Sequence, residues 1–150
     1  MIFKSQIIHQ MKHTHLYILL FTTILMGCTK NPETLLPHLS GYWEIDEVTL
    51  ADGTKRDFNY NETIDYISVT DSLTGFRKKL KPSFDGGYTT SEDAENLKIV
   101  IENDSLFIHY KTPYAEWREV VLNVNDEQLL ILNSQNVLYL YKRYKPLKLD

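Results

Sequence analysis

Hydrophobic and polar positions follow two different patterns along the chain. Near the amino terminus, Leu16–Met26 is one continuous, mostly apolar run. From residue 39 onward, apolar residues alternate with polar ones over short stretches, and turn signals such as Asp52-Gly53 and Asn103-Asp104 separate these stretches. A period of two predicts β-strands with one buried face, and no useful window shows the roughly 3.6-residue period of an amphipathic helix.

The alternation predicts eight or nine short strands. The clearest are Leu97–Glu102 and Leu106–Lys111, which a short turn at Asn103-Asp104 joins into a hairpin. In Tyr42–Leu50 the apolar positions change phase near Asp46-Glu47, which predicts a β-bulge. Further candidates are Ile64–Thr70, Phe76–Leu80, Trp117–Val124, Leu129–Leu132 and Val137–Tyr144. The pattern therefore predicts an all-β fold, which is a small antiparallel up-and-down barrel, a flattened barrel or a sandwich.

The apolar run at the amino terminus is too short to be a typical spanning helix, which needs about 20 apolar residues. Basic and histidine side chains at Lys12, His13 and His15 precede the run, and the small residue Gly27 follows it. This arrangement is typical of a secretory signal peptide. Met11 makes the better start for such a signal, so we interpret residues 1–10 as an upstream extension.

The end of the run resembles a bacterial lipobox, with the sequence Leu25-Met26-Gly27-Cys28. The resemblance implies cleavage between Gly27 and Cys28 and attachment of lipid to the Cys28 sulfur. Cys28 is the single cysteine of the chain, so no internal disulfide competes for it. A lipid anchor implies a location in the cell envelope. Thr29, in place of an aspartate, favours the outer membrane and leaves its periplasmic and surface sides open.

Three segments follow from this interpretation. Residues 1–27 form the lipoprotein signal peptide, residues 28–38 form the lipidated cysteine and a tether, and residues 39–150 form one β domain. Two prolines in the tether argue against a helix there. The chain after cleavage carries 20 acidic and 14 basic residues, a net charge of −6. This charge does not favour binding to nucleic acid.

The chain resembles the lipocalin-like domains of small Gram-negative envelope lipoproteins across residues 39–144. The resemblance rests on Leu39-Ser40-Gly41-Tyr42-Trp43 at the start, on the hairpins from Leu97 to Leu132, and on Tyr141-Lys142-Arg143 at the close. It implies that the first and last strands pair. Trp43 would then plug one end of the barrel, and Arg143 would lie over its ring in a cation–π contact.

One departure limits what the resemblance implies. Lipocalins proper usually carry a helix after the barrel, whereas only Lys145–Asp150 follow the last predicted strand. Ligand binding therefore does not follow from the fold alone. If a cavity exists, the aromatic side chains near strand centres are the candidates to line it. They are Tyr66, Trp117, Tyr139 and Tyr141.

Candidate catalytic and metal-binding chemistry is sparse in the sequence. His38 and His109 are the histidines after the signal, and we interpret His109 as outward-facing or hydrogen-bonded. The polar stretch Ser91–Asn96 lacks the spacing of a calcium loop and is interpreted as solvated. We expect no enzyme activity, no cofactor and no metal site.

The strongest charge feature is Arg77-Lys78-Lys79-Leu80-Lys81, which holds four cations in five residues. One interpretation is an ordinary edge strand, in which Arg77, Lys78, Lys79 and Lys81 block aggregation. The other is a contact with lipid phosphates or an acidic partner.

Two functions remain open for the whole chain. One is a non-enzymatic, lipid-anchored module that binds a small apolar or amphipathic ligand. The alternative is an accessory subunit that docks onto a larger envelope complex. The first requires a cavity open to solvent, and the second requires an apolar patch on the outside.

Overall fold

The alternating segments become strands in a computed structural model of the chain, which describes residues 31–90 and 93–146. The strands in this part of the chain are β1 (Gly41–Thr49), β2 (Lys55–Asp57), β3 (Ile64–Val69), β4 (Thr74–Pro82), β5 (Tyr88–Thr90), β6 (Glu95–Glu102), β7 (Ser105–Lys111), β8 (Glu116–Val124), β9 (Gln128–Asn133) and β10 (Leu138–Arg143). The predicted signal peptide, with Gly27 and Cys28, lies outside the described residues.

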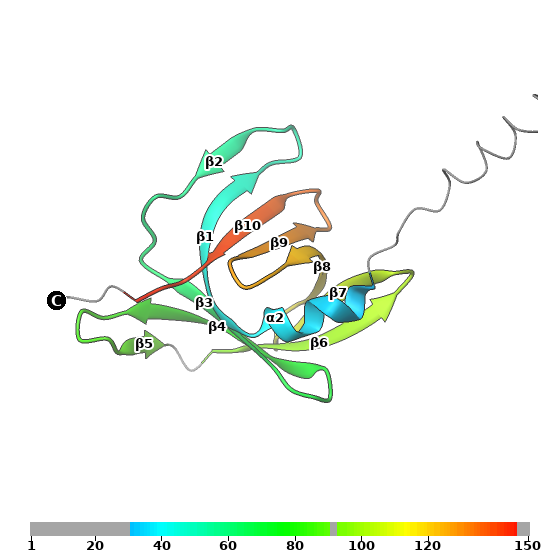
Figure 1. Cartoon of the computed structure of the whole chain (residues 1–150), viewed down its shortest axis with the longest axis horizontal. Helices are drawn as coiled ribbons and strands as arrows, with labels where there is room; N and C mark the ends of the chain where they lie inside the picture. Colours follow the sequence, from blue (N-terminus) through cyan, green and yellow to red (C-terminus); the bar gives the residue numbers. More distant parts are fainter. Residues whose placement is uncertain (1–30, 91–92, 147–150) are drawn as a thin grey trace, which may run out of the picture. The chain divides into compact units, whose positions relative to one another are not determined.

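Eight of these strands close into an antiparallel barrel (Figure 1). The order runs β10-β9-β8-β7-β6-β4-β3-β1, and β1 pairs with β10 to complete the ring. The short strands β2 and β5 are additions beside β1 and β4. The all-β fold and the barrel predicted from the alternation are confirmed, and the sandwich is excluded.

Local irregularities also follow the sequence. The pairing of β1 with β10 shifts register between Ile45 and Glu47, so the bulge predicted near Asp46-Glu47 is confirmed. β6 and β7 pair without interruption from Asn96↔Lys111 to Glu102↔Ser105, which confirms the predicted hairpin. A second register shift, between Val121 and Asn123 on β8, was not predicted.

The prediction that prolines exclude a helix from the tether is wrong. A 3₁₀ turn, η1 (Pro32–Leu35), runs directly into a short α-helix, α2 (Leu36–Leu39). Each segment carries its proline in the first turn, where the missing N–H would have had no helical partner. No helix in the described part of the chain is long and apolar enough to cross a membrane.

The helical segment contributes directly to the core. Leu39, at the end of α2, is fully buried with Trp43 of β1, and Leu35 and Leu36 pack against the same cluster. The core continues through inward-facing residues of the barrel strands, which are Ile67, Leu97, Ile99, Leu106, Ile108, Tyr110, Val121, Val124, Leu129 and Ile131. The helix therefore closes one end of the barrel, where β1 begins.

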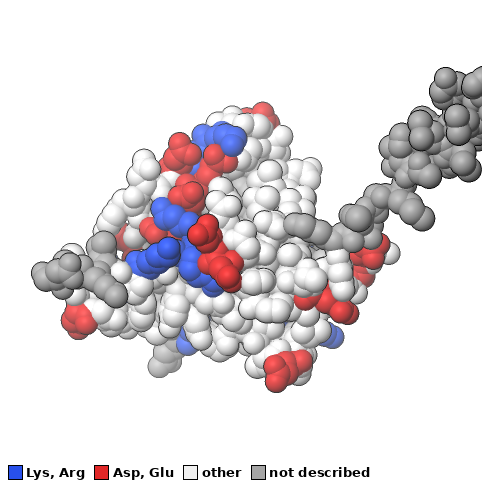
Figure 2. Space-filling model, viewed as in Figure 1, with Lys and Arg blue, Asp and Glu red and all other residues white. Residues whose placement is uncertain are grey.

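Charged side chains of both signs share the outside of the barrel. Figure 2 shows them interleaved in a stripe over β2, β1 and β10, while most of the surface around α2 is uncharged. On these strands, Lys55 Nζ lies 2.9 Å from a Glu47 carboxylate oxygen, and Lys142 Nζ lies 3.1 Å from Asp46 Oδ1. Such exposed pairs contribute little to stability, with a median of about 0–1 kcal/mol.

Candidate functional site

The closed end of the barrel is locked by Trp43 and Arg143. These residues face each other across the β1–β10 pairing, and the guanidinium carbon lies 3.6 Å from the centroid of the indole ring. Trp43 Nε1 donates a 2.9 Å hydrogen bond to the carbonyl oxygen of Leu39. The predicted contact between the two side chains is therefore present.

Arg143 also ties three segments together through main-chain carbonyl groups. Its guanidinium donates to the carbonyl oxygens of His38 and Ser40 at 3.0 Å, and to those of Asn125 and Asp126 at 3.3 and 3.1 Å. The first two belong to the end of α2, and the other two to the β8–β9 turn. Arg143 is thus a structural clamp on the plugged end.

Gly41 explains the spacing of the opening motif. Its φ of +141° disfavours other residues, and a Cβ built there would lie 2.0 Å from Arg143 Nη1. A side chain at this position would displace the guanidinium from the Trp43 ring. The pattern of Leu39, Gly41 and Trp43 therefore encodes the closed end of the barrel.

The opposite end of the barrel is the candidate binding site, and we call it the mouth. Because neighbouring strands are antiparallel and β1 begins at α2, the mouth collects the starts of β3, β6, β8 and β10 and the ends of β4, β7 and β9. Paired residues share a face of the sheet. The pairings that connect to core residues place these side chains inside at the mouth: Asp65, Arg77, Lys79, Glu95, Tyr110, Trp117, Glu119, Asn133, Tyr139 and Tyr141.

A buried cation occupies the centre of the mouth. The Arg77 side chain is only 14% exposed, and its Nε donates to a carboxylate oxygen of Glu95. Its Nη1 lies 3.5 Å from Glu119 Oε2 and 3.3 Å from the Tyr110 hydroxyl. The guanidinium carbon also lies 4.3 Å from the centroid of the Tyr110 ring. One arginine thus holds two carboxylates and a tyrosine from three strands.

Burial at the mouth changes the protonation equilibria. Desolvation raises the pKa of Glu119, against the opposing effect of Arg77. Desolvation also raises the pKa of Tyr110 and of Tyr141, so both are neutral phenols. For Arg77 desolvation would lower the pKa, but Tyr110 and the two carboxylates outweigh it and raise the pKa. The guanidinium therefore stays charged, while Glu119 is a carboxylate whose charged form burial disfavours.

A second ion pair lies beside this cluster. Asp65, on β3, is 3% exposed, and Lys79 Nζ lies 2.8 Å from both of its carboxylate oxygens. The Lys79 side chain itself is 64% exposed. Asp65 acts electrostatically on both Glu119 and Tyr141, so the two ion pairs belong to one interior layer.

A family model of the lipocalin-like domain matches residues 39–131, which include both the closed-end motif and most of the mouth. The chain belongs to the lipocalin-like domain family. No curated protein matches it. Solved structures similar to this lipocalin-like chain include a lipocalin-like protein from Bacteroides uniformis ATCC 8492, with 12% identity and a TM-score of 0.46. An uncharacterized protein from Bacteroides eggerthii DSM 20697 has 11% identity and a TM-score of 0.45. Each alignment covers 71% of this chain and 99% of the other chain.

Three of the four aromatic residues predicted to line a cavity of this lipocalin-like barrel face its interior. Trp117 stacks on Tyr110, with ring centroids 5.1 Å apart, and Asn133 donates a 3.4 Å hydrogen bond to the Tyr139 hydroxyl. Tyr141 follows on the same face of β10. The prediction for Tyr66 is wrong, because the neighbouring Asp65 and Ile67 face inward.

Tyr66 instead belongs to an aromatic row on the outer surface of the barrel. Its ring centroid lies 4.7 Å from that of Tyr42 and 5.8 Å from that of Phe76. Tyr88 of β5 stacks on the other side of Tyr42 at 5.2 Å. The row fixes the β4–β5 hairpin against the outside of the barrel.

The interpretation of the basic run as an edge strand is wrong. β4 pairs with β3 along one side and with β6 and then β5 along the other, so it is an interior strand of the barrel sheet. Because successive side chains of a strand point to opposite faces, the four cations of the basic run also lie on different faces of β4. Arg77 and Lys79 face the mouth, Lys78 lies on the outer face, and Lys81 pairs with Glu62 at 3.6 Å. The four cations do not form one surface for phosphates or an acidic partner.

His109 lies on the outer face of β7, as predicted, where its ring packs edge-on against Phe107. Its Nε2 is buried without a hydrogen-bond partner. It borders a shallow depression of about 480 Å³ over β6, β7 and β8, which lies outside the barrel because Lys98, His109 and Arg118 form its outward row. Among residues 31–90 and 93–146, no three His, Cys, Asp or Glu side chains are grouped to hold a metal ion.

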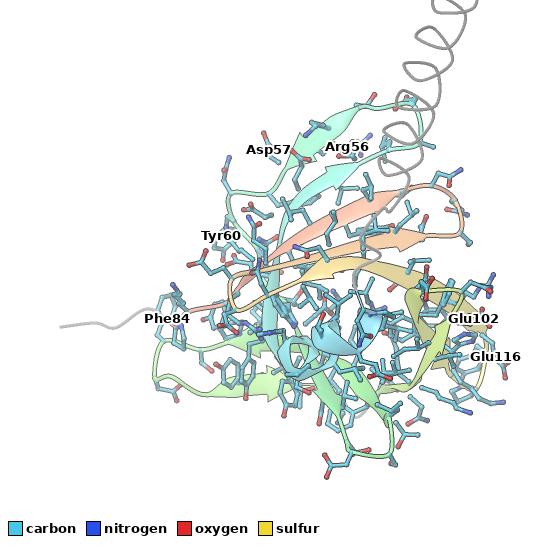
Figure 3. All side chains as sticks on the ribbon, turned by 45° about the vertical axis from the view of Figure 1, so that its right-hand side comes forward. Arg56, Asp57, Tyr60, Phe84, Glu102 and Glu116 are labelled. Carbon is cyan, nitrogen blue, oxygen red and sulfur yellow. The ribbon has the colours of Figure 1, made fainter. Side chains whose placement is uncertain are left out.

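Exposed aromatic side chains lie on three connections at the mouth end. Tyr60 precedes β3, Phe84 follows β4, and Tyr114 lies between β7 and β8. They are 81%, 95% and 96% exposed. Figure 3 shows Tyr60 and Phe84 projecting from their loops into solvent. These side chains add exposed apolar surface at the end of the barrel that carries the charged interior layer.

Sequence reasoning missed the acidic residues of the mouth. Asp65, Glu95 and Glu119 come from three different strands, and each looks like an ordinary surface acid in its own segment. The sequence does carry a signal for Asp65, because it lies two residues before the buried Ile67 and therefore occupies an inward-facing position on β3. Recognising that position requires the pairing of Asp65 with Trp43, which is a long-range contact.

Proposed function

We propose that this lipocalin-like protein is a non-enzymatic, lipid-anchored binding module of the bacterial cell envelope, and that it takes a small amphipathic ligand at the barrel mouth. The observation that carries the proposal is the interior layer of charged and aromatic side chains at one end of a barrel whose other end is closed. A pocket that combines apolar walls with a few placed polar groups is the usual form of a small-molecule site.

The mouth favours an amphipathic ligand over a wholly apolar one. Trp117 and Tyr139 offer apolar contact area, whereas Asp65, Arg77 and Glu119 are charged groups held in ion pairs. Covering such groups with hydrocarbon alone would remove water without replacing its hydrogen bonds, which is costly. A ligand with a polar head and an apolar body avoids this cost. None of the ten inward-facing side chains named above for the mouth is a serine or a histidine, which supports a binding role over catalysis.

The lipobox resemblance at Cys28 supports the anchor and the envelope location, with the outer membrane favoured. Two residues separate Cys28 from Asn31, so three Cα–Cα steps of about 3.8 Å each span at most about 11 Å. A lipidated Cys28 would therefore hold the closed end of the barrel near the membrane surface.

Replacing Cys28 with alanine should release the protein from membranes. Stable attachment needs more than one acyl chain, and the cysteine is the single site that could carry them. The measurement is fractionation of cells after high-salt washing of the membranes. The matched control is Lys78→Gln with Lys81→Gln, which should leave attachment unchanged. Persistence of the Cys28→Ala protein in the washed membranes would contradict the anchor.

The alternative function, docking onto an envelope protein, is favoured by a different observation. An apolar row crosses the outside of five barrel strands through direct cross-strand pairs. Every member of the row is only partly buried, and its members are Val100, Phe107, Val120, Leu132 and Leu138. A partner that covers this row would make the surface, and not the mouth, the functional site.

Native mass spectrometry of the anchored protein, extracted gently from its own envelope, distinguishes the two functions. An added mass of a few hundred daltons, lost when Trp117 and Tyr139 are both replaced by alanine, is the expected result. If the double variant retains that mass, the ligand binds at a site other than the mouth. A stoichiometric protein partner without a small ligand would favour the accessory role.

A further inference from the structure

The ion pair between Asp65 and Lys79 is unequal in its exposure to solvent. The Asp65 side chain is 4% exposed and is fixed inside the barrel, whereas the Lys79 side chain is 64% exposed. A lysine ammonium is a compact charge on a flexible four-carbon stem. Lys79 can therefore swing into solvent without disturbing the fold, while the Asp65 carboxylate remains where it is. The pair therefore consists of a fixed carboxylate and a cation that can leave it.

The remaining charges determine what can replace that cation. Arg77 is already held by Glu95 and Glu119. When Lys79 leaves, the interior layer contains three carboxylates against one guanidinium. An incoming carboxylate would meet this excess of negative charge, and a neutral head group would leave Asp65 without a counter-ion. A cationic head group restores the balance, because an opposite charge stabilises a buried carboxylate.

Aromatic side chains beside Asp65 suit the same head group. Tyr141 is close enough to Asp65 for the carboxylate to affect its pKa, whereas the ring of Trp43, the residue paired with Asp65, is already covered by Arg143. Trp117 lies nearer the rim, stacked on Tyr110. Aromatic faces attract ammonium and guanidinium groups. The apolar body of the ligand would lie against Trp117 and Tyr139, toward solvent.

We propose that Asp65 is the recognition site for a primary ammonium group on an amphipathic ligand, and that Lys79 occupies this site until the ligand displaces it. The proposal rests on the proposed function and names the chemical class of its ligand. The proposed role of the Asp65–Lys79 pair differs from that of a purely structural ion pair in one testable respect, because Lys79 competes with the ligand. Removing Lys79 should strengthen binding of a cation more than removing Lys81, an exposed lysine of the same strand that does not pair with Asp65.

The experiment uses the full chain in zwitterionic nanodiscs, with empty nanodiscs as the blank, and isothermal titration calorimetry. The probes are octylammonium, octanoate and octanol, which share one alkyl length. We expect octylammonium to bind most tightly. Lys79→Ala should increase its affinity up to about fivefold, since an exposed lysine partner contributes at most roughly 1 kcal/mol. Asp65→Asn should lower it at least about tenfold, the loss of a charged hydrogen bond.

Lys81→Ala is the matched control, because Lys81 lies on the same strand, is 60% exposed and pairs with the exposed Glu62. It should leave octylammonium affinity unchanged. If Asp65→Asn does not fold, the octylammonium affinities of Lys79→Ala and Lys81→Ala still test whether Lys79 competes with the ligand. Tighter binding of octanoate or octanol, or no gain with Lys79→Ala, would overturn the ammonium assignment and leave the mouth as a ligand site. Absence of binding by all three probes would overturn both.

Discussion

Replacing Trp43 with alanine should lower the free energy of unfolding by about 3–5 kcal/mol, the cost of truncating a large buried aromatic residue. The Trp43 side chain has no exposed surface, and its indole fills the closed end above Leu39. The change also removes a hydrogen-bond donor from the Leu39 carbonyl oxygen and the ring beneath the Arg143 guanidinium. The closed end would lose its packing and both polar contacts together.

Urea unfolding at neutral pH, followed by far-ultraviolet circular dichroism, measures this effect without depending on tryptophan fluorescence. Trp117→Ala is the matched control, because Trp117 is also an inward-facing tryptophan but is only partly buried at the mouth. Its loss should destabilise the protein much less. A Trp43→Ala protein within about 1 kcal/mol of the wild type would be incompatible with a buried plug.

The closed end was predictable because its signals are local or lie at the ends of the fold. The glycine between Leu39 and Trp43 and the cations after Tyr141 are readable as motifs, and closure of a barrel requires its first and last strands to pair. The bulge near Asp46-Glu47 was equally readable, since it changes the phase of apolar positions within one strand. Each of these features leaves a trace in consecutive residues.

The helical turns at residues 32–39 were not predicted, for a local reason that can be stated. The presence of two prolines predicts that no helix forms, but their positions matter more than their number. Pro32 and Pro37 each occupy a first turn, where proline is tolerated. Packing of Leu39 into the barrel then stabilises segments that are too short to be helical alone.

The mouth was only partly predictable, because its charges meet through long-range strand pairing. Trp117, Tyr139 and Tyr141 could be proposed from their type, since aromatic residues on strands are commonly inward. The inward position of Arg77 could not be proposed in the same way. It depends on the pairing of β4 with β3 and β6, which converts a basic surface run into a buried ion pair.

Replacing Arg77 with methionine should lower the free energy of unfolding by about 3–5 kcal/mol at neutral pH, as expected when one partner of a buried ion pair is removed. Methionine keeps much of the side-chain volume, so the loss comes from charge. Glu119 would remain buried as a carboxylate without its cation, and Glu95 would lose the same partner. Urea unfolding of both proteins across a range of pH values measures this difference.

The pH dependence identifies the cause of that loss. Burial already raises the pKa of Glu119, and removal of Arg77 raises it further. A carboxyl whose folded pKa lies above its unfolded value favours the fold at low pH and loses that contribution as pH rises through the folded pKa. The deficit of Arg77→Met relative to the wild type should therefore shrink from pH 7 to pH 5. A deficit independent of pH would point to packing instead.

Arg118→Met provides the matched control, because Arg118 also pairs with a carboxylate and lies over an aromatic ring, but on the outer surface. It should cost less than about 1 kcal/mol. Adding Glu119→Gln to Arg77→Met should recover stability and reduce the pH dependence, since no buried carboxylate of that pair remains. If this double variant is as stable as the wild type, the barrel does not need these charges to fold. Their presence at the mouth would then be explained by what the mouth binds.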